Sequence, residues 1–247
     1  MMNPPMLWLA AACVSLGGAL SIGASHATLP LLALVIPVLF FLPAAGVAGW
    51  MMLAGLSLYG FTLPYQLPAI SVAVWMTVPV LALAFGPRSH WQVSVLVICI
   101  LLAMNTGILA LQSEGKLPGS AIVTVTQVAS VCLVWFAARC WKFTPPYQLW
   151  PLLLVAALLV AGHLGAAALA MCVSLLIYFL QEIRRKAPEK WLSHLIVILP
   201  AIAFAALVLH PKLDVPSPVF VAWILTLSSA WLGEYLLENE DEEEEEL

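Results

Sequence analysis

The residues best able to bind a ligand in this chain carry amide or hydroxyl groups and no charge. Asn105 and Thr106 are adjacent, and Gln127 follows in the next long apolar run. Amides and hydroxyls offer hydrogen-bond donors and acceptors without net charge, which suits a neutral or zwitterionic ligand. Hydrogen bonds between packed helices are the alternative use of such residues. We take these three residues, together with His163, as the candidate substrate-binding set.

The five histidines raise the alternative of haem or metal binding, because neutral imidazoles ligate both. No two histidines share ligand spacing within one expected helix, and most fall in connecting turns. His163 lies in a segment broken by Gly162 and Gly165, where a capped turn is the alternative to a binding role. The five cysteines lie in apolar runs without a C-x-x-C pair. We therefore expect no metal and no cofactor.

Charged groups are missing from the interiors of the apolar runs. Arg139, Glu182 and Glu234 lie at the ends of these runs, and the interiors contain no Asp, Lys or Arg. Ion-coupled transporters usually carry a charged residue within the membrane. The chain also lacks H-E-x-x-H and G-x-S-x-G, which are signatures of zinc and serine hydrolases. These features argue against a proton pump and against an enzyme.

A polar turn occurs twice in the chain, as FTLPYQL at residues 61–67 and as FTPPYQL at residues 143–149. The two copies differ only where Leu63 is replaced by Pro145. A duplicated unit that covers 45–111 and 119–183 is one interpretation, and a shared local turn requirement is the other. The candidate gating or interface residues of the two turns are Tyr65, Gln66, Tyr147 and Gln148.

The elements that must position these residues are membrane helices. Hydrophobic residues make up 63% of the chain and charged residues only 9%, whereas soluble domains carry about 25% charged residues. The apolar runs approach the length of about 20 residues that crosses a bilayer, and helices satisfy their own backbone groups there. The sequence therefore predicts an all-α, polytopic integral membrane bundle that forms a single domain over residues 1–237.

About ten spans are expected. They lie near 6–24, 29–42, 45–60, 68–86, 91–111, 119–140, 148–162, 164–183, 192–210 and 217–236. The segments 29–61 and 148–183 are too long for one crossing and short for two. Each is therefore either two thin spans or a hairpin buried in protein, because irregular backbone must not face lipid. The expected number of spans is accordingly eight to ten.

The orientation follows from the basic loops. Arg88, then Arg139 with Lys142, and then the cluster at 184–190 fall on one side of the predicted topology. Since basic loops face the cytoplasm, both termini are expected there, in a plasma membrane of the bacterial inner-membrane type. An odd number of spans separates the two polar turns, so a duplicated unit would be inverted. Inverted repeats are common in secondary transporters.

Most of the 13 acidic residues lie in the segment 238–247, which therefore sets the net charge of −4. A block of like charge is usually disordered, and anionic lipid repels it. We expect a disordered cytoplasmic tail that is a candidate docking segment for a basic protein partner. The other expected partner is the lipid bilayer, and no nucleic acid is expected.

Three functions fit these observations. The first is a permease for a small neutral or zwitterionic solute, built on an inverted repeat. The second is a non-catalytic subunit or scaffold of an envelope complex that docks through the acidic tail. The third is a haem-binding or redox membrane protein, which rests only on the histidine and tryptophan content.

Overall fold

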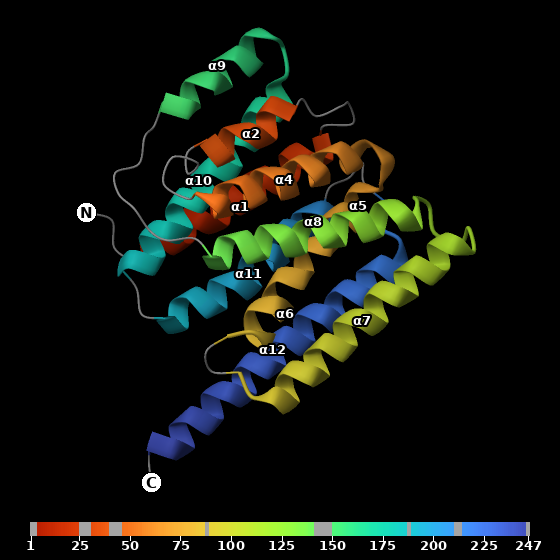
Figure 1. The fold of residues 1–247 in the computed structure, drawn as a ribbon, viewed down its shortest axis with the longest axis vertical. Helices are drawn as coiled ribbons and strands as arrows, with labels where there is room; N and C mark the ends of the chain where they lie inside the picture. Colours follow the sequence, from red (N-terminus) through yellow and green to blue (C-terminus); the bar gives the residue numbers. More distant parts are fainter. Residues whose placement is uncertain are drawn as a thin grey trace.

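The computed structural model describes residues 4–24, 31–39, 46–86, 89–140, 150–186, 189–209 and 214–245. All regular structure in these ranges is helical, which confirms the predicted all-α class (Figure 1). The long helices are α1 (Pro4–Ala24), α4 (Val47–Thr62), α7 (Trp91–Ser113), α8 (Ala121–Cys140), α10 (Leu164–Lys186), α11 (Glu189–Leu209) and α12 (Ser217–Glu245). The short helices are α2 (Leu31–Leu39), α5 (Pro68–Ala73), α6 (Thr77–Ala84) and α9 (Leu153–Val160), with 3-10 turns η1 (Leu63–Tyr65), η2 (Val74–Met76) and η3 (Trp150–Leu152).

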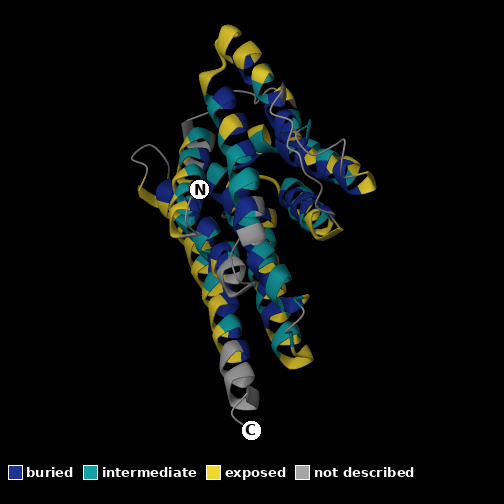
Figure 2. Ribbon diagram, turned by 90° about the vertical axis from the view of Figure 1, so that its left-hand side faces the viewer, coloured by how far each residue is buried: buried dark blue, intermediate teal, exposed yellow. Residues whose placement is uncertain are grey.

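Four helical segments are long and apolar enough to cross a membrane, namely 47–65, 91–113, 121–140 and 217–237. Exposed positions follow the outward faces of the long helices (Figure 2). Large apolar side chains are among them, such as Leu102 at 57% exposure and Ile122 at 78%. An apolar surface of this kind is unfavourable in water, but it is stable in contact with the hydrocarbon chains of lipid. The chain is therefore a helical membrane protein in contact with lipid. The expected count of ten spans is not confirmed.

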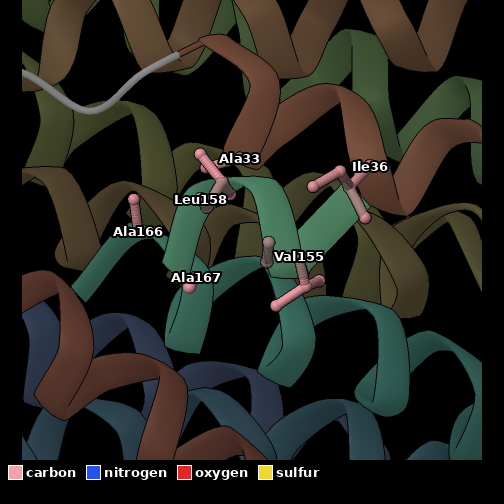
Figure 3. Packing of buried hydrophobic residues seen from close by; sticks show 7 residues of the cluster. Ala33, Ile36, Val155, Leu158, Ala166 and Ala167 are labelled. Atoms are coloured by element: carbon pink, nitrogen blue, oxygen red, sulfur yellow. The ribbon is translucent and has the colours of Figure 1, made fainter. Parts of the chain in front are cut away.

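Two short helices occupy the segments in which the sequence predicted interruptions. α2 has 9 residues and α9 has 8, which at 1.5 Å per residue is less than half of the roughly 30 Å hydrocarbon core. They pack against each other and against α10, so that Ala33 and Ile36 of α2 lie beside Val155 and Leu158 of α9 (Figure 3). Each segment thus contains an element that is too short to cross the membrane alone.

A broken helix occupies the centre of the bundle. α5 and α6 follow one another along 68–84, but the 3-10 turn η2 separates them. Pro79 explains the break, because proline has no N–H and its ring collides with the carbonyl four residues earlier, that of Trp75 in η2. Residues of this broken helix contribute to clusters with α7, α8, α11 and α12. The sequence predicts an uninterrupted span at 68–86, whereas the structure has this broken helix.

α4 and α8 approach each other closely at a glycine. A methyl group added to Gly55 of α4 would lie 3.0 Å from the backbone oxygen of Ser130 and 2.8 Å from Val134 Cγ2, both on α8. Small residues permit this backbone approach in membrane bundles, where van der Waals packing drives helix association. α1, α10 and α11 form a second packed group around Leu7, Ile183 and Leu195.

Several helix ends meet at one end of the bundle. Phe85, just after α6, lies 5.5 Å from the ring of Trp135 near the end of α8. His194, early in α11, lies 3.9 Å from the Glu234 carboxylate of α12. The ends of α6 and α8, the beginning of α11 and the later part of α12 are therefore neighbours. The α4–α5 turn and the α7–α8 loop contact each other at the other end of α8.

α12 continues to Glu245, so the helix runs through most of the acidic segment for which the sequence predicts disorder. Leucine and glutamate both favour helices, and the segment extends a helix that has already formed. The docking role of the segment stays a prediction.

Candidate functional site

Three uncharged side chains form a closed ring of hydrogen bonds where the α4–α5 turn meets the α7–α8 hairpin. Gln66 Nε2 donates to Thr124 Oγ1, and Thr124 Oγ1 donates to Gln112 Oε1 at 2.7 Å. Gln112 Nε2 closes the ring by donating to Gln66 Oε1 at 3.3 Å. The three residues are buried, with exposures of 8% for Gln66, 7% for Gln112 and 1% for Thr124. We call this group the amide ring.

The repeated polar turn delivers Gln66 to the amide ring. Pro64 lies inside η1, and Pro68 begins α5, so the backbone between them cannot continue as one helix. Gln66 is extended, with φ −133° and ψ 152°, and its N–H donates to Leu63 O at 3.3 Å. The polar turn thus interrupts the chain and turns the Gln66 side chain inward, whereas the neighbouring Tyr65 is exposed.

Two glycines shape the α7–α8 loop over the ring. Gly115, at φ +70°, ends α7 with its N–H bonded to Gln112 O, while the N–H of Lys116 bonds to Leu111 O. This is the Schellman arrangement, which requires a left-handed residue after the helix. Gly119 has φ +105°, and a Cβ there would overlap Gln66 Oε1. The loop closes over the amide ring because this position has no side chain.

A cavity of about 20 Å³, partly open to the surface of the bundle, lies next to the amide ring. The broken helix α5–η2–α6, α7, α8 and α12 line it, and Thr124 belongs to both the cavity wall and the ring. Its polar lining residues are Thr77, Asn105, Thr124, Trp223 and Thr226. The volume is that of about one water molecule, so a larger ligand requires the walls to separate.

Two residues of the cavity wall contain buried polar atoms that lack a partner among the described residues. They are Thr77 Oγ1 and Trp223 Nε1. Asn105 uses its Nδ2 within its own helix, where it donates to Leu101 O at 2.8 Å. Buried polar groups usually find hydrogen-bond partners, and an unmade bond costs about 1–3 kcal/mol. Unpartnered neutral groups beside a cavity favour an uncharged polar ligand.

A second polar cluster lies against the broken helix. Gln127 Nε2 donates to Ser71 Oγ at 2.9 Å, and the Tyr59 hydroxyl donates to Ser71 O at 2.7 Å. Gln127 is fully buried, and its Oε1 has no partner among the described residues. Thr124, Gln127 and Ser130 recur every three residues, so α8 turns one polar face to the interior.

The candidate residues from the sequence fall in different environments. Asn105 lines the cavity, and Gln127 lies in the second polar cluster. Thr106 is on the exposed face of α7, where its hydroxyl donates to Leu102 O at 2.8 Å within the same helix. His163 caps α9: its N–H bonds to Leu158 O at 3.0 Å, and its side chain is exposed. In this structure His163 therefore lies in a capped turn, which was the alternative to a binding role.

The second polar turn cannot be compared with the first. Tyr147 and Gln148 lie in 141–149, outside the described residues. Gln112 and Trp223 are not among the candidate residues that the sequence indicated. A glutamine at the end of an apolar run was the available signal for Gln112, but nothing local distinguished it from a glutamine at the membrane surface.

The site offers hydrogen bonds rather than acid–base groups. Over the ranges that the structure describes, no three His, Cys, Asp or Glu side chains gather closely enough to hold a metal ion. Glu114 and Lys116, on the loop above the amide ring, pair with each other at 2.6 Å and are largely exposed. The arrangement is therefore suited to binding a polar, uncharged molecule.

Comparison with known proteins adds no further constraint. No protein-family model matches the chain, and no curated protein or solved structure matches it either.

Proposed function

We propose that the protein is a membrane permease for a small neutral or zwitterionic solute and is not an enzyme. The observation that carries this proposal is the cavity between α5–η2–α6, α7, α8 and α12, with uncharged polar groups in its wall. In this structure the cavity has room for about one water molecule and for no larger solute. The solute enters when the helices around the cavity separate at one end.

The broken helix supports the proposal. Transporters often build their binding sites from interrupted helices near the middle of the membrane, where irregular backbone lies in protein and not in lipid. Here the interruption at η2 lies within the bundle, and Val74, Met76 and Thr77 at the interruption line the cavity. The Tyr59 hydroxyl and the Gln127 amide bond to Ser71 just before it. Side chains of neighbouring helices thus support this part of the backbone.

We further propose that both termini are cytoplasmic in a bacterial inner membrane and that 45–111 and 119–183 form an inverted repeat. The ends of α6 and α8 lie together. In the sequence, Arg88 follows α6 and Arg139 belongs to the last turn of α8, so both basic residues fall on the same side of the membrane. Because basic loops face the cytoplasm, this placement supports the proposed orientation. α8 supports the inversion: Thr124 contacts the first polar turn, and Cys140, at the opposite end of the helix, precedes the second. Single cysteines at Tyr65 and Tyr147, labelled with an impermeant maleimide, should react from opposite sides.

The permease proposal is tested by solute entry into proteoliposomes. Vesicles are mixed with a hyperosmotic solution of urea, acetamide, glycerol, glycine or sodium chloride, and re-swelling is followed by light scattering. At least one neutral or zwitterionic solute should enter faster than into protein-free vesicles. Trp223→Phe and Thr77→Val, which remove the two unpartnered polar groups, should change that rate. Thr126→Val serves as the control, since among the described residues Thr126 on α8 bonds only to Ile122 O of its own helix.

The same assay decides between the two leading functions. If no solute enters faster than into empty vesicles, the permease proposal is wrong. The envelope-complex subunit then becomes the leading function, and α12, which continues as helix through Glu245, is its docking element. Removal of residues 238–247 should in that case abolish co-purification of a basic partner protein.

A further inference from the structure

We propose that the amide ring of Gln66, Gln112 and Thr124 is the gate and selectivity site at one end of the cavity. Its ligand is a small uncharged solute of the carboxamide or urea class. This inference rests on the proposed permease function and specifies the solute that the permease admits. It also gives a role to Gln66, which the repeated polar turn carries into the ring.

The position of the ring is that of a gate. On one side lies the α7–α8 loop, whose Lys116 and Ser120 are exposed, and on the other side lies the cavity. Thr124 is part of both, because its hydroxyl holds the two amides while the residue lines the cavity wall. The ring joins two separate parts of the chain, the α4–α5 turn and the α7–α8 hairpin. Breaking its bonds therefore frees these parts to separate.

The hydrogen bonds of the ring are arranged so that a solute can replace them one for one. Going around the ring, each of the three residues donates one hydrogen bond and accepts one. A carboxamide or urea carries an N–H beside a C=O, so it can donate to Gln66 Oε1 and accept from Gln112 Nε2 at the same time. The buried amides then keep their partners when the ring opens. A hydroxyl can also bridge two amides, as Thr124 does in the ring. A flexible polyol must fix its rotatable bonds to do so, which costs affinity that a rigid, planar amide does not lose.

The ring offers nothing to an ion. Its members are uncharged, and the nearby Glu114 and Lys116 pair with each other on the exposed loop. Transfer of an unpaired ion into a buried site is far more costly than transfer of a neutral polar group. An apolar molecule of the same size gains no hydrogen bonds in the ring. The chemistry of the ring thus selects against both classes.

The first test measures selectivity with a matched pair of substitutions on α8. Thr124→Val replaces the hydroxyl of the ring by a methyl group, and Thr126→Val makes the same change at a residue that bonds only within its helix. In the re-swelling assay, acetamide and urea should enter the natural protein faster than glycerol, and sodium chloride should not enter. Thr124→Val should reduce the preference for amides over glycerol by about fivefold, the effect of one net hydrogen bond. Thr126→Val should not, and Thr124→Ser should restore the preference.

The second test does not depend on transport. In a background without the five natural cysteines, a cysteine replaces Met104 in the cavity wall, and its reaction with a small water-soluble methanethiosulfonate is timed. Opening of the ring by Thr124→Val or Gln112→Leu should raise the reaction rate several-fold, whereas Thr126→Val should leave it unchanged. Size-exclusion chromatography establishes that each variant remains folded.

The outcomes separate the two proposals. If no solute enters the vesicles, the permease function is wrong and the selectivity role falls with it. If solutes enter but glycerol is as fast as acetamide, or Thr124→Val leaves the preference intact, the permease stands and this inference is wrong. If Met104→Cys reacts at the same rate with and without the ring, the ring is a fixed structural clasp, which also overturns the gate.

Discussion

Substitution by alanine should affect stability differently at three glycines, one within α7 and two in the loop that follows it. Gly107 lies within α7, and a Cβ there would meet no atom within 4 Å. Gly115 has φ +70° and is equally open, whereas Gly119 has φ +105° and no room because Gln66 Oε1 occupies the place of a Cβ. Alanine at these positions therefore separates three contributions: helix propensity, backbone strain and displacement of the amide ring.

The expected magnitudes follow from these surroundings. Gly107→Ala should stabilise the protein by about 0.5–1 kcal/mol, because alanine loses less conformational entropy in a helix. Gly115→Ala should destabilise it by about 1–2 kcal/mol, the cost of a left-handed backbone for a residue with Cβ. Gly119→Ala adds the loss of one or two hydrogen bonds in the ring, each about 0.6–1.7 kcal/mol in membrane proteins. Its total is about 2–5 kcal/mol.

The measurement is the free energy of unfolding in mixed detergent micelles, titrated with SDS and followed by tryptophan fluorescence. A double-mutant cycle locates the extra cost. With Gln66→Ala the colliding Oε1 atom is absent, and the remaining close neighbour, Gln112 Nε2 at 3.0 Å, is the end of a flexible side chain that can move aside. Gly119→Ala should then cost about as much as Gly115→Ala does. If Gly119→Ala costs no more than Gly115→Ala in the natural protein, the loop does not hold the ring closed. That result would refute a ring held closed by the absence of a side chain at Gly119.

Two further pairs of substitutions use the same unfolding assay. Phe204 is fully buried and stacks on Trp223 with ring centroids 3.9 Å apart, so Phe204→Ala should cost about 3–5 kcal/mol. Phe136→Ala, on the exposed face of α8, should cost less than about 1 kcal/mol. Gly55→Ala should cost about 1–3 kcal/mol, because the added methyl lies 3.0 Å from a backbone carbonyl that cannot turn aside. Gly18→Ala meets only ordinary contact at 3.6 Å, and a loss above about 1 kcal/mol there would contradict this packing argument.

The positions of the helices could be predicted from the sequence because they depend on local features. The expected spans 91–111 and 119–140 correspond to α7 (Trp91–Ser113) and α8 (Ala121–Cys140). Apolar run length and the polar residues between the runs define these limits. The interruption at η2 was not predicted, although Pro79 is visible in the sequence. A proline within an apolar run is compatible with a continuous membrane helix, and neighbouring helices decide which form is stable.

The site could be predicted only in part. Asn105 lines the cavity, and Gln66 and Gln127 have buried polar partners, but the binding and gating roles of these residues stay predictions. Gln112 and Trp223 were missed because their roles depend on which helices become neighbours. Nothing in the local sequence brings the α4–α5 turn to the α7–α8 hairpin. The duplication remains a prediction, because the second polar turn lies outside the described residues.

The pairing of α2 with α9 has a consequence for the biogenesis of the protein. A helix of 9 residues is too short to partition into a bilayer as an independent segment. The surface that covers Ala33 and Ile36 comes from α9 and α10, which emerge from the ribosome only after α4 to α8. α2 can pack on α4 through Leu34 and Val38 soon after both are made, but its face with Ala33 and Ile36 stays uncovered until the later half arrives. The order of synthesis thus makes this contact a late step of assembly, and it exposes a chain truncated before α9 to quality-control proteolysis.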